Sequence, residues 1–107
     1  MGVFNFLRGP DINQGVKEYG ETGGALLLDV RTPQEYRAGH IPGSKNIPLQ
    51  ELDRVSAAAG GKNVPLFVYC RSGARSRQAV SALQHMGYQH VKNIGGISAY
   101  TGKVEIV

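Results

Sequence analysis

The chain has 107 residues, of which 41% are hydrophobic and 19% charged, as is typical of one small globular domain. Its single cysteine excludes an internal disulfide and a structural zinc site of the CxxC type. The formal net charge is +4, but the cations are scattered apart from Arg71, Arg75 and Arg77, which favours a small anion over nucleic acid as a partner.

The first residues carry none of the common targeting signals. Residues 1–9 hold a short apolar run with no basic stretch before it and no small-residue cleavage site after it. No apolar run approaches the roughly 20 residues of a membrane span. We therefore expect a cytoplasmic protein without membrane contact, a single domain over 1–107 with its core at about 10–102.

Apolar runs and turn residues predict an alternation of strands and helices. Thr32, Pro33 and Glu35 have the spacing of a capping box that opens a helix. Because apolar strands alternate with helices, we predict an α/β fold with a mostly parallel sheet and helices on both faces. In chain order we expect a helix over 12–19, a strand over 25–30, a helix over 33–38, a turn over 39–43, a strand over 46–47, a helix over 49–58, a strand over 65–69, a helix over 77–86, a strand over 91–94, a helical stretch over 97–100 and an edge strand or tail over 104–107.

The only cysteine, Cys70, lies where a predicted strand runs into a helical pattern. Ligands of parallel sheets bind beyond the carboxyl ends of the strands, and Cys70 is at such an end. The segment 70–76 reads CRSGARS, and its Gly73 permits a backbone conformation that other residues resist. Backbone N–H groups that converge in such a loop bind anions, and a thiolate held there has a pKa of roughly 3.5 to 7.5 instead of about 8.5.

Side chains of the same loop add further donors. Ser72 and Ser76 carry hydroxyl groups, and Arg75 carries a planar cationic fork. The alternative interpretation is an inert, buried cysteine, which is common in small proteins. The combination of a strand, a glycine-containing loop, two arginines and a helix favours a nucleophile.

Two blocks of residues carry a resemblance to a known family. The first reads LDVRTPQEY over 28–36 and GHIPGSKNIP over 39–48. The second reads VYCRSGARS over 68–76 and is followed by GY at 87–88 and GGI at 95–97. With these blocks the chain resembles the rhodanese-like single-domain sulfurtransferases over about residues 25–100. The resemblance implies the rhodanese fold, a five-stranded, mostly parallel sheet flanked by helices.

The resemblance also implies covalent sulfur transfer without a metal or an organic cofactor. The Cys70 thiolate would attack the outer sulfur of thiosulfate or a similar anionic donor, and sulfite would leave. The persulfide would then pass its terminal sulfur to cyanide, a thiol or a protein acceptor. The residues expected to bind the donor and the persulfide are Arg71, Ser72, Gly73, Ala74, Arg75 and Ser76.

Other positions of the two blocks have less direct roles. Asp29 and Arg31 follow a predicted strand at the same sheet end as Cys70, and we expect them to pair and to support the neighbouring loops. His40 is expected to pack and to form hydrogen bonds rather than to act as a base. Tyr100 stands where the family usually has tryptophan, and we expect it to keep the aromatic packing.

Three alternative functions follow from the same residues. The first is phosphatase or arsenate reductase activity. Cysteine phosphatases, some on the same fold, have a longer loop than the four residues between Cys70 and Arg75, and the shorter loop matches sulfur better than phosphate. A second alternative is a persulfide carrier that docks an acidic protein on a basic rim. A third is a domain that only binds a partner. Nothing in the sequence implies an obligate dimer, and we expect a monomer.

Overall fold

The computed structural model describes residues 9–107. The expectations about targeting signals rest mainly on residues 1–8, which lie outside the described part of the chain. Within residues 9–107, no helix has both the length and the apolar character needed to cross a bilayer.

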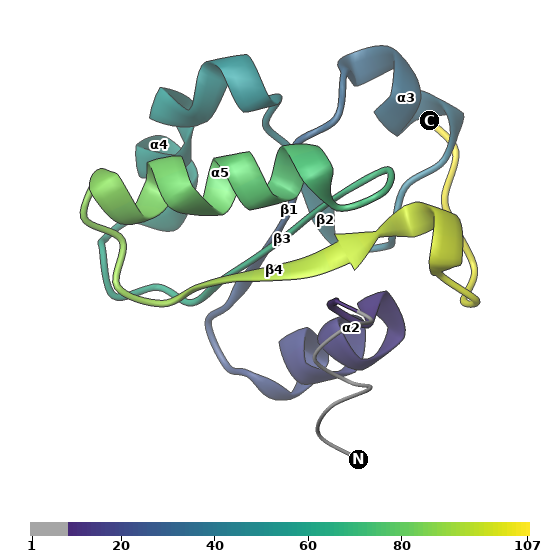
Figure 1. The fold of residues 1–107 in the computed structure, drawn as a ribbon, viewed down its shortest axis with the longest axis horizontal. Helices are drawn as coiled ribbons and strands as arrows, with labels where there is room; N and C mark the ends of the chain where they lie inside the picture. The colour runs from purple at the N-terminus through teal and green to yellow at the C-terminus, as the bar shows by residue number, and fades with distance from the viewer. Residues whose placement is uncertain (1–8) are drawn as a thin grey trace.

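A parallel, four-stranded sheet forms the centre of the fold (Figure 1). This confirms the predicted α/β class, but the expected count of five strands is wrong. Among residues 9–107 the one further pairing is an isolated antiparallel bridge between His40 and Glu105, because residues 101–107 stay exposed and bury no apolar face. In spatial order the strands are β2 (Ser44–Asn46), β1 (Leu26–Asp29), β3 (Leu66–Cys70) and β4 (Val91–Gly96).

The sheet separates two hydrophobic clusters. One lies between the sheet and α2 (Ile12–Glu21), and the other between the sheet and α5 (Ala74–His85), on the opposite face in Figure 1. Side chains of a strand alternate between the two faces, so Tyr69 packs in the α2 cluster and Cys70 in the α5 cluster. The thiol therefore faces the helix that follows it in the chain.

The remaining elements surround the carboxyl ends of the strands and the α5 face. The predicted helix over 49–58 is divided, because Glu51 has a non-helical backbone. The predicted capping box is confirmed, since Thr32 and Glu35 each accept the backbone N–H of the other. These elements are α3 (Pro33–Ala38), the 3-10 helix η1 (Leu49–Arg54), α4 (Val55–Ala59) and the 3-10 turn η2 (Ile97–Ala99).

The start of α5 differs from the prediction. The apolar spacing predicted a helix from Arg77, whereas α5 begins at Ala74. Gly73 has φ of 103° and reverses the chain directly after Cys70, and its carbonyl accepts the Arg77 N–H at 3.1 Å. The loop between β3 and α5 is therefore limited to residues 71–73, and the first turn of the helix lies beside the thiol.

The close packing of α2 on β4 depends on a glycine. A Cβ atom added at Gly15 would lie 2.3 Å from Cβ of Ile94, a branched side chain that is itself buried. We predict that Gly15→Ala lowers the free energy of unfolding by about 1–3 kcal/mol, the usual range for overpacking. Urea denaturation would measure this change.

Gly20→Ala, in the same helix, is the matched control. A Cβ at Gly20 meets nothing within 4 Å, so this variant should be as stable as the wild type or slightly more stable. Equal stability of the two variants would contradict the close packing of α2 on β4.

Candidate active site

Cys70 ends β3 with its side chain buried, at 1% exposure. Its sulfur accepts a hydrogen bond from the Gly73 N–H at 3.0 Å, and the hydroxyl of Ser76 lies 3.5 Å away. A strand end, a left-handed glycine and the first turn of α5 thus bring hydrogen-bond donors to one sulfur atom.

These donors change the acidity of the thiol. Burial raises the pKa of Cys70, but the Ser76 side chain and the backbone N–H groups of Ser76, Gly73 and Ser72 together outweigh burial and lower the pKa. Hydrogen bonds to the charged form stabilise an anion in this way. The site can therefore hold a sulfur anion away from bulk water.

The paired glycines at the end of β4 support the loop from the other side. A Cβ at Gly96 would lie 2.3 Å from the Arg71 carbonyl oxygen, so only glycine allows this approach. The same carbonyl accepts the Ser98 N–H at 3.1 Å. The backbone of the loop is therefore held by the turn after β4, while the Arg71 side chain remains exposed.

Arg75 makes a two-point ion pair with Glu35. The two guanidinium nitrogens lie 2.8 and 3.0 Å from the two carboxylate oxygens. Arg75 together with the Thr32 N–H lowers the pKa of Glu35 to about 2. The guanidinium expected to meet an anionic donor is thus bound to the capping box of α3, and it connects α5 to that helix.

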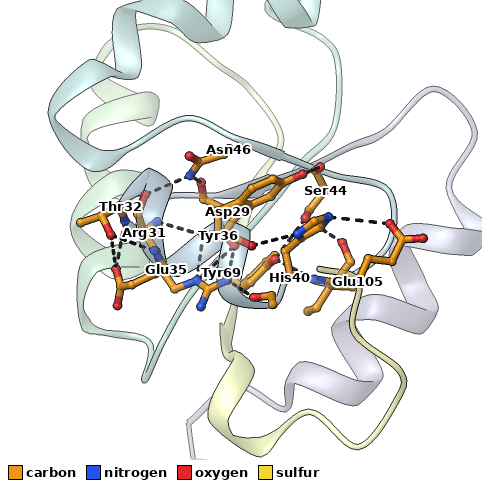
Figure 2. Close-up of polar contacts among 12 residues, drawn as sticks. Asp29, Arg31, Thr32, Glu35, Tyr36, His40, Ser44, Asn46, Tyr69 and Glu105 are labelled. Carbon is orange, nitrogen blue, oxygen red and sulfur yellow. Dashed lines mark hydrogen bonds and ion pairs between the residues drawn. The ribbon is translucent and has the colours of Figure 1, made fainter. Parts of the chain in front are cut away.

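Asp29 and Arg31 form a buried pair at the neighbouring strand end (Figure 2). The Arg31 guanidinium donates to both carboxylate oxygens of Asp29, at 2.7–3.1 Å, and to the Gly39 carbonyl at 2.7 Å. The Asn46 amide donates to the carbonyls of Asp29 and Arg31. The side-chain pair therefore connects the end of β1 to the turn after α3, and the Asn46 side chain connects β2 to the backbone of the same segment.

His40 lies in the same turn and takes part in its packing. Its ring stacks on Tyr36 with the ring centres 3.8 Å apart, and its Nδ1 lies 2.9 Å from the Tyr36 carbonyl oxygen (Figure 2). On its other side, Nε2 lies 3.7 Å from Glu105. These contacts agree with the expected packing role, and they connect His40 to α3 and to the C-terminal segment.

Asn93 is a residue of the site that the sequence analysis missed. Its amide contacts Ser76, Gly73 and Gly95, all next to the sulfur or to the turn after β4. The available signal was an uncharged polar residue inside the predicted strand over 91–94, two residues before a pair of glycines. Sequence alone does not show which face such a residue occupies, and β4 was predicted without this role.

Residues 13–103 match the rhodanese-like domain family. The chain belongs to this family. It is 45% identical over 71 residues to the thiosulfate sulfurtransferase PspE of Escherichia coli K12, covering 65% of this chain and 68% of the relative. A solved rhodanese with anions from E. coli is 38% identical, with a TM-score of 0.73, and covers 78% of this chain and 99% of that one.

A further relative of this rhodanese-like chain is a larger protein. The putative sulfur carrier protein YrkF of Bacillus subtilis 168 is 38% identical over 80 residues, which make up 74% of this chain and 43% of the relative. Tyr100, for which the sequence predicted aromatic packing, packs against the α2 cluster. The aromatic packing expected from the sequence is therefore present.

The first prediction for the site concerns the pH dependence of Cys70 alkylation. Because its pKa is lowered, the rate of reaction with iodoacetamide should reach half its maximum at a lower pH than in an ordinary thiol. The same chain unfolded in urea provides the reference, and Cys70→Ser should not react. A midpoint equal to that of the unfolded chain would contradict the stabilised thiolate.

The second prediction concerns the Glu35–Arg75 pair at low pH. Folding depresses the pKa of Glu35 from 4.5 to about 2, so its contribution to stability is fully present above pH 4.5 and is lost as the pH falls toward 2. The wild type should therefore lose more of its free energy of unfolding over this interval than Glu35→Gln does. Glu51→Gln, in the exposed pair with Arg54, is the control and should follow the wild type.

Proposed function

We propose that this chain transfers the outer sulfur of thiosulfate through a persulfide on Cys70. The observation that carries the proposal is the sulfur of Cys70 at a strand end, accepting the Gly73 N–H at 3.0 Å. Membership of the rhodanese-like sulfurtransferases and the similarity to PspE support the same reaction.

The reaction follows two displacement steps at sulfur. The Cys70 thiolate attacks the outer sulfur of thiosulfate, a new S–S bond forms, and the old S–S bond breaks so that its electron pair leaves with sulfite. In the second step, cyanide or a thiolate attacks the terminal sulfur, and Cys70 leaves as the thiolate. The chain begins and ends the cycle in the same state, so no external oxidant or reductant is needed.

The loop residues have distinct proposed roles in these steps. The N–H groups of Ser72, Gly73 and Ser76 stabilise the anionic sulfur before and after transfer. Arg71 is exposed and forms no ion pair within the described residues, so its guanidinium can meet the sulfonate end of the donor. For Arg75 we propose an indirect role. Its ion pair with Glu35 holds the first turn of α5, which includes Ala74, in place beside the sulfur.

The test is the intact mass of the purified chain after incubation with thiosulfate. We expect a gain of one sulfur atom that is absent in Cys70→Ser and is lost on adding cyanide. Arg71→Ala should load sulfur more slowly at low thiosulfate and equally fast at high thiosulfate. Absence of any gain, with the thiol shown to be free, would overturn the thiosulfate proposal.

A persulfide carrier is the second candidate, favoured by the similarity to YrkF, which is named a putative sulfur carrier. Such a carrier would accept sulfur and release it only to a protein partner. Steady-state turnover of thiosulfate and cyanide separates the two functions. Fast turnover supports the enzyme, whereas a stable persulfide that persists in cyanide supports the carrier.

A further inference from the structure

We propose that Asn93 is a positioning residue that tunes the reactivity of Cys70 through the hydroxyl of Ser76. The inference rests on the proposed function, in which Cys70 is the sulfur-carrying nucleophile. It concerns an amide on β4, distant in sequence from the β3–α5 loop, that contacts the loop next to the sulfur.

The orientation of the Asn93 amide follows from its backbone partners. The Gly95 N–H, which can only donate, lies 3.0 Å from Oδ1, and the Gly73 carbonyl, which can only accept, lies 3.3 Å from Nδ2. Both contacts require the same orientation. The atom that faces the Ser76 hydroxyl at 2.7 Å is therefore an oxygen, and in that contact Ser76 must be the donor.

Ser76 has one proton to donate and three acceptors nearby. They are Oδ1 of Asn93 at 2.7 Å, the Gly73 carbonyl at 3.0 Å and the sulfur of Cys70 at 3.5 Å. Ser76 is fully buried, at 0% exposure. Because a hydroxyl carries a single hydrogen, these three acceptors compete for it. While Cys70 is a neutral thiol, Ser76 donates its hydrogen to Asn93, which makes the shortest contact.

This competition sets how much Ser76 helps the sulfur anion. When the thiolate or the persulfide anion forms, the negative sulfur attracts the Ser76 proton more strongly than a neutral thiol does. Turning the hydroxyl toward the sulfur then requires breaking its bond to Asn93. Asn93 therefore makes the thiolate less stable than it would be if the Ser76 hydroxyl had no competing acceptor on β4. As a result, Cys70 is less reactive at low pH.

Asn93 also has a structural contact that predicts the opposite effect. Its Nδ2 holds the carbonyl of Gly73, whose own N–H donates to the sulfur. If Asn93 only supported the loop, its removal would weaken that N–H bond and make Cys70 resemble an unfolded thiol. The sign of the change therefore separates tuning through Ser76 from simple support.

The experiment is the pH profile of Cys70 alkylation in four variants. With Asn93→Ala, the rate on the acidic side of the midpoint should rise about fivefold, as expected when one net hydrogen bond is transferred to the anion. With Asn93→Asp, a stronger acceptor of similar size, the midpoint should move to higher pH. Ser76→Ala should also raise the midpoint. In the double variant Ser76→Ala/Asn93→Ala, alkylation should be no faster than in Ser76→Ala alone.

Asn13→Ala is the matched control, because its amide contacts Ala99 and Thr101 and none of the loop residues. Its alkylation profile should equal that of the wild type. An unchanged or higher midpoint in folded Asn93→Ala would overturn the inference. If that variant does not fold, the rise in midpoint caused by Asn93→Asp is measured again in the Ser76→Ala background. A rise that is equally large without the Ser76 hydroxyl would overturn the inference instead, because charge or loop support alone would then explain it.

The outcome is independent of the sulfur-loading test. Alkylation reports the thiol itself, whereas the mass gain with thiosulfate reports sulfur transfer. A shifted midpoint without sulfur loading would leave the role of Asn93 intact and overturn the proposed function. Sulfur loading together with an unchanged alkylation midpoint in Asn93→Ala would support the proposed function and overturn the role of Asn93.

Discussion

The site depends on one constraint, that a sulfur anion out of contact with bulk water must be satisfied by hydrogen-bond donors. Cys70 meets it because β3 ends inside the α5 cluster and the chain turns back at once through Gly73. The turn directs the Gly73 N–H at the sulfur, and the first turn of α5 brings Ser76. Burial alone would raise the pKa of this thiol, and the donors reverse that effect.

The donors are useful only if the short loop stays in place, and neighbouring segments hold it there. The Glu35–Arg75 pair connects the start of α5 to α3, so one carboxylate both caps a helix and anchors the loop. On the other side, Gly96 allows the end of β4 to contact the Arg71 carbonyl. The buried Asp29–Arg31 pair holds the turn after α3 against the same end of the sheet. The three supports join different elements at the carboxyl ends of the strands.

In our proposal, the Asn93–Ser76 contact adjusts the chemistry of the site as well as its shape. A hydroxyl that donates to a neutral amide oxygen can turn to an anionic sulfur without any backbone movement. The backbone of the loop thus stays in place, while the Ser76 hydroxyl can change the acceptor to which it donates. The proposed cycle of Cys70 through thiol, thiolate and persulfide would use a donor of this kind.

The sequence by itself determined the order of strands and helices, the capping box at Thr32 and the position of Cys70 at a strand end. These features depend on local periodicity and on residues within a few positions of each other. The start of α5 was misplaced because a left-handed Gly73 decides it, and the sheet has four strands because residues 101–107 bury no apolar face. Only the tertiary structure decided that Arg75 meets Glu35, that Asn93 meets Ser76 and that Gly96 meets the loop. These contacts join residues far apart in the chain, and their geometry exists only once the parallel strands have aligned their ends.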